Sequence, residues 1–76
     1  MTELEWMEIF SRNLVDIMKE ARISQRELSD MIGVSEGTIS KYIRMQQMPG
    51  VKTIINIAYA LDYNFDDIID FGDKID

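Results

Sequence analysis

Short polar and basic side chains follow one another over residues 35–44, and they can make the hydrogen bonds that recognise paired bases. The Lys41 ammonium group could donate to guanine O6 and N7, and Thr38 could offer its hydroxyl, or its methyl group to thymine. Glu36 could accept from a cytosine amino group, or it could simply favour a helix N-terminus. Gly37 has no side chain but permits a close backbone approach. We therefore predict base contacts from Glu36, Gly37, Thr38 and Lys41.

Two short helices joined by a tight turn are predicted to position these groups. Ser24 can cap the first helix, and Glu27 three residues later completes a capping box, so that this helix begins at the next residue after the cap. Gly33 marks its end, because glycine takes up a left-handed C-terminal conformation without a Cβ clash. An apolar residue before a serine cap restarts the helical pattern at Ser35. A turn this short forces the two helices to cross steeply.

Each of these helices carries an apolar face that we expect to be buried. The two faces consist of Leu28, Met31 and Ile32 in the first helix and Ile39, Tyr42 and Ile43 in the second. Ser29 is the small residue expected where the helices come closest. The second helix then presents its polar side to solvent, which is the geometry that inserts a helix into the major groove of DNA.

Three further helices and no strand are predicted from the rest of the sequence. Apolar residues recur at spacings of three and four from Leu4 to Ala21, where Trp6 is either a core residue or a surface anchor for a partner. Residues 44–50 lose this periodicity and end in Pro-Gly, which indicates a loop. A fourth helix and a last short helical turn follow, with apolar stripes at Val51, Ile54, Ile55, Ile57, Ala58 and Leu61, and at Phe65, Ile68 and Ile69.

The predicted fold is therefore all-α, a compact five-helix bundle in a single domain over residues 1–76, with the helix-turn-helix pair at residues 24–44. The acidic tail at residues 72–76 is short and polar, so we expect it to fray. From a length of 76 residues we expect one small domain and no second catalytic or ligand-sensing domain.

The composition argues against catalysis and metal binding. The chain has no cysteine and no histidine, which excludes disulfides, thiolate zinc sites, imidazole catalysis and cysteine nucleophiles. Asp66, Asp67 and Asp70 are better explained as a solvated helix end than as acid-base groups or a calcium loop. We expect no enzyme activity, cofactor, metal or small-molecule ligand. Without a secretory signal or a run of about 20 apolar residues, the chain is expected to be cytoplasmic and not to associate with membranes.

The net charge of −6 opposes DNA binding, because neutralised phosphates supply most of the nonspecific affinity. The charges are unevenly distributed, however. Residues 21–52 hold five basic and three acidic side chains, whereas residues 1–20 hold two and five, and residues 53–76 hold one and six. A local positive face can bind a polyanion while the far side repels it, since salt screens the field over about 10 Å. We expect modest, salt-sensitive affinity.

The chain resembles, over most of its length, the phage-repressor-like helix-turn-helix family, also called the xenobiotic-response-element type. The matching residues are Ile17, Ile23, Ser24-Gln25, Gly33-Val34-Ser35, Thr38-Ile39-Ser40, Tyr42, Pro49, Ile54, Ile57-Ala58, Ala60-Leu61 and Phe65-Asp66-Asp67-Ile68-Ile69. The resemblance implies a lambda-repressor-like bundle in which Gln25 contacts the phosphate backbone. Our further phosphate candidates, favoured by helix N-terminal amides or by basic and hydroxyl groups, are Arg26, Ser35, Ser40 and Arg44. Arg26 and Lys41 could instead be ordinary solvated side chains.

The sequence departs from the family at two places. Many relatives pair an arginine with a glutamate where this chain has Met18 and Ile43, so apolar contact should replace the ion pair without loss of the fold. Relatives also tend to be basic after the third helix, whereas this loop has two glutamines between Met45 and Met48. These methionines are expected to be exposed and could meet a protein as easily as DNA.

The expected function is a sequence-specific transcriptional regulator of double-stranded DNA, of the repressor type. One recognition helix covers only a few base pairs, so we expect a homodimer on two half-sites. Its contact surface could come from Met45 and Met48 together with Phe65, Ile69 and Phe71. Two alternatives stay open: a protein-interaction module that has lost DNA contact, and an antitoxin-like accessory subunit that binds DNA and a partner protein.

Overall fold

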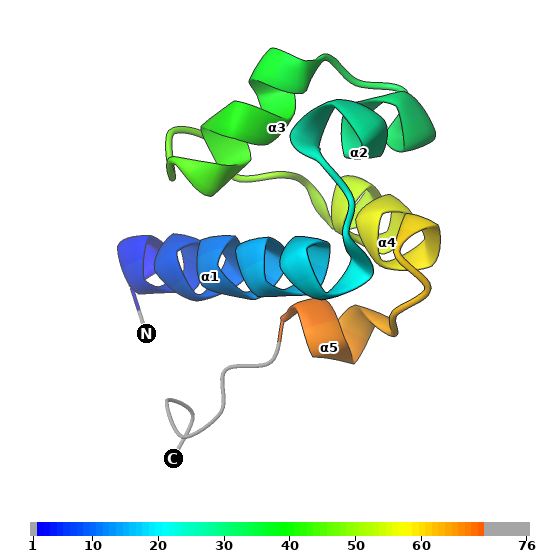
Figure 1. The fold of residues 1–76 in the computed structure, drawn as a ribbon. Coiled ribbons are helices and arrows are strands. Elements are labelled where there is room, and N and C mark those ends of the chain that lie inside the picture. Colours follow the sequence, from blue (N-terminus) through cyan, green and yellow to red (C-terminus); the bar gives the residue numbers. More distant parts are fainter. Residues whose placement is uncertain (1, 70–76) are drawn as a thin grey trace.

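The computed structural model describes residues 2–69, which form five helices and no strand (Figure 1). The helices are α1 Glu3–Ala21, α2 Gln25–Ile32, α3 Glu36–Ile43, α4 Val51–Ala60 and α5 Phe65–Ile68. This confirms the predicted all-α class, the predicted helices and the loop over residues 44–50. The predicted fraying of residues 72–76 and the roles considered for Asp70 and Phe71 lie outside the described residues. Within residues 2–69, no helix is both long and apolar enough to cross a membrane.

Helix α1 lies across the molecule, with α3 on one side and α5 on the other (Figure 1). Helix α2 packs against both α3 and α4, and α4 in turn packs against α5. All five helices contribute to one hydrophobic core. Its largest fully buried side chains are Phe10, Leu14, Leu28, Ile39, Ile57 and Ile68. The core therefore lies directly behind α2 and α3 and holds that pair in place.

The helices begin where local capping predicts. Ser24 Oγ accepts a hydrogen bond from Glu27 N at 3.0 Å, and Glu27 Oε1 accepts one from Ser24 N at 3.0 Å, so the predicted capping box of α2 is confirmed. Thr2 and Glu5 form the same arrangement at the start of α1. At α5, Asp67 Oδ2 accepts from Asn64 N at 3.1 Å, so this carboxylate serves a helix end.

A residue with positive φ follows each of the first four helices, directly after α1 and α2 and two residues beyond the ends of α3 and α4. Gly33 follows α2 with φ 76°, as predicted, and its amide donates to Ser29 O at 2.9 Å. The corresponding residues after α1, α3 and α4 are Arg22, Met45 and Asp62. These three endings were not predicted, because their side chains give no signal comparable to glycine. At each of these three ends, the amide of the residue after the positive-φ residue donates a hydrogen bond back to a carbonyl of the helix. After α1, for example, Ile23 N donates to Met18 O at 3.0 Å.

Two glycines of the motif should respond to alanine in opposite directions. Gly33→Ala is expected to lower the free energy of unfolding by about 1 kcal/mol, since a Cβ is strained at φ 76° although it meets no atom within 4 Å. Gly37→Ala is expected to raise it by roughly 0.5 to 1 kcal/mol, because this position lies inside α3 and has room for a Cβ. Urea denaturation of the two variants and the parent tests both signs. A more stable Gly33→Ala variant would contradict the explanation of the turn.

The structure corrects several predictions of burial. Met31 and Ile55 are exposed, because each lies roughly 100° around its helix from the centre of the buried face, at the 100° per residue of an α-helix. Val51 is exposed as well. Met48, expected at the surface, is half-buried and packs against the core, whereas Met45 is exposed as predicted.

The apolar groups predicted for a dimer surface are also largely used within the chain. Phe65 and Ile69 are both half-buried and pack against the core cluster. Trp6 packs against the same cluster and stacks on Phe10, with ring centroids 6.0 Å apart. Of its two predicted roles, core residue or surface anchor, the structure therefore supports the first. The surface near α5 therefore offers less apolar area to a partner than the sequence suggested.

Candidate functional site

Helix α3 has one buried and one solvent-facing side. Ile39 and Tyr42 are buried, and Ile43 is half-buried against the core. Burial raises the pKa of the Tyr42 phenol, because the charged phenolate would lose its hydration in the core. The predicted inner face of α3 is thus confirmed, and the rest of the helix is left to face solvent.

The predicted base-contacting residues lie on or near the outer side of α3. Glu36, Gly37 and Lys41 are exposed, and Thr38 is half-buried. The four residues occupy one and a half turns at the start and middle of the helix, which is the part that meets base edges when a recognition helix enters a groove. Lys41 is the only cation among them, so it is the strongest candidate for a hydrogen bond to guanine.

The N-terminus of α3 organises two hydroxyl groups. Ser35 Oγ accepts a hydrogen bond from Thr38 N at 3.1 Å, and it lies 2.8 Å from Thr38 Oγ1. Because the two hydroxyls share a hydrogen bond, the Thr38 hydroxyl can make one hydrogen bond fewer to a base edge. Of the two contacts considered for Thr38, this geometry favours the one made by its methyl group.

The predicted phosphate-contacting residues are distributed over the starts and ends of α2 and α3. Gln25 and Arg26 are exposed in the first turn of α2, and Arg44 is exposed just after α3. Ser35 is exposed at its capping position, while Ser40 is half-buried. The N-terminal amides of α2 and α3 add partial positive charge at these places. At α2 the Glu27 carboxylate counteracts this positive charge, because it accepts the hydrogen bond of the Ser24 amide.

The capping box of α2 should make stability depend on pH. Hydrogen bonds from the Ser24 amide and hydroxyl hold the pKa of Glu27 below its usual value. A lowered folded-state pKa means that this stabilisation is present above the unfolded-state pKa and is lost as pH falls through the folded one. Glu27→Gln keeps a capping partner without the titration. We expect the parent chain to lose more stability than this variant between pH 7 and pH 3, measured by urea denaturation. Equal losses would contradict the assignment.

Packing behind the motif fixes the angle of α3. Ser29 is buried, and its Oγ donates to Arg26 O at 2.7 Å, so its hydroxyl is satisfied within α2. Ser11 of α1 is buried too, and its Oγ donates to Ile43 O at 2.6 Å. This bond ties the end of α3 to α1 across 32 residues of sequence. Sequence reasoning missed Ser11, although a small polar residue beside the apolar stripe of α1 was an available signal.

The positions that carry an ion pair in many relatives are apolar here. Met18 is buried in the core, and Ile43 packs against the same cluster. An open groove lies beside them, lined by apolar and charged residues. They are Val15, Met18, Lys19, Arg22, Ile23, Ser24, Gln25, Glu27 and Ile43. The predicted replacement of charge by apolar packing is therefore present between α1 and α3.

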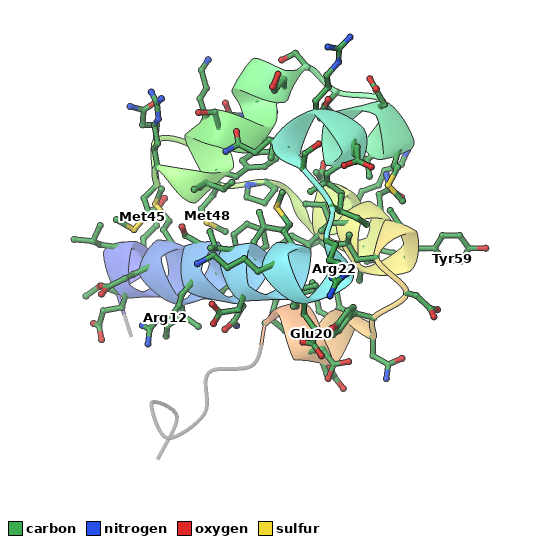
Figure 2. The ribbon with its side chains drawn as sticks, in the orientation of Figure 1. Arg12, Glu20, Arg22, Met45, Met48 and Tyr59 are labelled. Atoms are coloured by element: carbon green, nitrogen blue, oxygen red, sulfur yellow. The ribbon has the colours of Figure 1, made fainter. Side chains whose placement is uncertain are left out.

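The charged side chains of α1 include groups well away from the motif. Figure 2 shows Arg12 pointing from α1 to the side opposite α2 and α3. Glu20 lies on the same lower side, toward α5. Its hydrogen bond with Tyr63 raises the pKa of that phenol. These charges act at a distance from α3, where salt screens them.

Comparison with known proteins identifies the family of this chain. A protein-family model described as helix-turn-helix matches residues 14–68. A curated relative, an uncharacterized HTH-type transcriptional regulator named YqaE from Bacillus subtilis (strain 168), is 31% identical over 58 residues. That match covers 76% of this chain but only 50% of the relative. The chain therefore corresponds to about half the length of the regulator it resembles.

Proposed function

We propose that this chain, which belongs to the phage-repressor-like helix-turn-helix family, binds DNA and regulates transcription by inserting α3 into the major groove. The observation that supports this most directly is the two-sided character of α3. Ile39 and Tyr42 anchor it to the core, while Glu36, Gly37 and Lys41 are exposed to solvent. A helix held in this way can enter a groove without disturbing the fold.

In this proposal Lys41 and Glu36 make hydrogen bonds to base edges, and Thr38 offers its methyl group to thymine. Gly37 lets the backbone of α3 approach the bases closely. The contacts that set the register on phosphates come from Gln25, Arg26, Ser35, Ser40 and Arg44. The small number of long side chains on α3 implies that each half-site is short.

We further propose that two copies bind two half-sites about 34 to 36 Å apart, one turn of the double helix. Short half-sites make such pairing necessary for useful specificity. We propose repression in the cytoplasm as the regulatory outcome, because occupying DNA is by itself enough to block access to it. Activation would need an additional productive contact with the transcription machinery.

Selection of binding sites from random duplex DNA tests the proposal. We expect an enriched two-fold symmetric sequence whose affinity falls steeply with salt, with a slope of about −0.9 per phosphate contact in a plot of log affinity against log salt concentration. A reporter gene placed behind the selected sequence should fall in expression when the protein is present. No enrichment at any salt concentration would overturn the proposal in favour of an interaction module, which the net charge of −6 would suit.

A further inference from the structure

The groove at the corner between α1 and α2, called the corner groove below, has the size of a small-molecule site. Its volume is about 550 Å³, within the range of about 300 to 1,000 Å³ that such sites occupy. Its apolar lining consists of Val15, Met18, Ile23 and Ile43. Because these residues come from α1, the turn after it and the end of α3, no local sequence pattern indicated a ligand site.

Val15 shows that this lining is more than the outer edge of the core. Ile23 and Ile43 are half-buried and pack against the core cluster. Val15 is half-buried too, but it does not belong to the residues that pack against that cluster. Its side chain therefore offers apolar surface to the corner groove that the fold itself does not use.

The rim of the corner groove is positively charged, although the whole chain carries −6. Lys19 and Arg22 line the groove and are exposed, and within residues 2–69 neither forms an ion pair with a carboxylate. The one acidic group in the lining is Glu27, whose Oε1 accepts a hydrogen bond from Ser24 N at 3.0 Å. Two cations against one carboxylate leave an excess of one positive charge, which favours an anion.

The other carboxylates of α1 lie on a different face of the helix. The groove residues of α1 and its cap, at positions 15, 18, 19 and 22, lie at spacings of three and four and share one face. Arg12, Asp16 and Glu20 follow one another at spacings of four on another face. Figure 2 shows Arg12 and Glu20 on the lower side of α1, away from α2 and α3. These acids therefore leave the cations of the groove unneutralised.

The backbone holds the two cations in one turn at the end of α1. Arg22 has φ 58°, and its amide donates to Lys19 O at 3.2 Å. The next amide, that of Ile23, donates to Met18 O at 3.0 Å. Both cations are thus positioned next to the apolar lining before any ligand arrives, which lowers the entropic cost of binding.

We propose that the corner groove binds a small organic acid, a carboxylate on an apolar body such as an aromatic ring system. The carboxylate accepts hydrogen bonds from Lys19 and Arg22, and the apolar body lies against Val15 and its apolar neighbours. DNA phosphates could pair with the same cations, but they would leave the apolar lining uncovered. The combination of lining and charge therefore favours the organic acid.

Binding of the acid should weaken binding of DNA. Gln25, a proposed phosphate contact, lines the same groove, and Ile43 is the last residue of α3. A bound carboxylate adds negative charge beside the proposed phosphate contacts, so it repels the DNA backbone. This coupling rests on the proposed function, whereas binding of the acid to the chain alone does not.

Isothermal titration calorimetry of the full chain with 2-naphthoate, in the absence of DNA, tests the site. We expect a dissociation constant of roughly 0.1 to 1 mM, as suits a small ligand in an open groove. The neutral 2-naphthalenemethanol and the cationic 2-naphthalenemethylamine carry the same ring system and should bind at least about tenfold more weakly. No saturable binding of 2-naphthoate up to about 5 mM would overturn the inference.

Variants of the rim test which groups hold the carboxylate. Lys19→Gln and Arg22→Gln should each raise the dissociation constant about 3- to 10-fold, since each removes one charge-assisted hydrogen bond. Arg12→Gln removes the same charge from another face of α1 and should leave the constant unchanged. Equal effects of all three variants would show attraction by net charge alone and would overturn the inference.

A variant of the apolar lining gives an independent test. Val15→Glu places a carboxylate inside the corner groove and should raise the dissociation constant at least about tenfold. Leu4→Glu makes a similar change at an exposed residue of α1 and should have no effect. Thermal unfolding establishes that both variants are folded. Binding of 2-naphthoate that is indifferent to Val15→Glu would overturn the inference.

Titrations with the selected duplex separate the inference from the proposed function. Saturating 2-naphthoate should weaken DNA binding at least about threefold. Binding of 2-naphthoate to a chain that selects no DNA site would overturn the proposed function and leave the groove supported. If Lys19→Gln and Arg22→Gln instead each reduced the salt slope of DNA binding by about 1, and 2-naphthoate did not bind, the rim would be a phosphate contact and the inference would be wrong.

Discussion

Ile39→Ala is expected to lower the free energy of unfolding by about 2 to 5 kcal/mol, the range observed when a large buried aliphatic side chain is truncated. Ile39 is 0% exposed and lies in the core shared by all five helices. A core of this size supplies only a few kcal/mol of net stability. We therefore expect a substantial unfolded fraction at 25 °C and loss of DNA binding, followed by urea denaturation and far-UV circular dichroism.

The matched control for this variant is Ile55→Ala. The chemical change is the same, but Ile55 is 49% exposed on the outer side of α4, so little packing is lost. We expect its stability to stay within about 0.5 kcal/mol of the parent. Similar losses in both variants would show that Ile39 does not anchor α3 as the structure indicates.

Lys41→Ala is expected to weaken binding to the selected DNA site by about 1 to 3 kcal/mol, or roughly 5- to 150-fold, and to relax the preference at one base pair. The reason is that Lys41 is exposed on the outer side of α3 and is the one cation among its base-contacting candidates. Fluorescence anisotropy with the selected duplex and with duplexes changed at single positions measures both effects. The free energy of unfolding should stay within about 0.5 kcal/mol of the parent, since an exposed side chain is removed.

Two further variants separate base contacts from charge. Arg44→Ala should weaken binding to all sequences alike and reduce the salt slope by about 1, as expected for a phosphate contact. Arg12→Ala removes the same charge from the side of α1 that points away from α3, so it should change neither the sequence preference nor the salt slope. If Arg12→Ala and Lys41→Ala weakened binding equally, the cations would act only through net charge, and α3 would not be the contact surface.

The unusual feature of this domain is how little it offers to DNA. Net charge is unfavourable, and the exposed side of α3 has one lysine and otherwise short or acidic groups. Both facts imply low affinity for a single copy on a single half-site. Under the proposed function, specific occupancy would therefore require two copies bound to two half-sites.

The sequence was sufficient to predict the helices and several of their ends, because these depend on interactions between residues three to five positions apart. The box formed by Ser24 and Glu27 and the left-handed Gly33 are examples, and both were found where predicted. The helix-turn-helix motif was recognisable for the same reason. Its spacing is local, and so is the separation of apolar and polar sides along α3.

Contacts between distant residues determined the remaining features. Whether Met31 and Ile55 are buried depends on which neighbour each helix packs against, and the period of the helix alone leaves that choice open. The bond from Ser11 to the carbonyl of Ile43 joins residues 32 positions apart, so no local pattern encodes it. The same packing leaves Val51, Ile55 and Tyr59 outside, because the inner side of α4 is already filled by α2, α5 and the core.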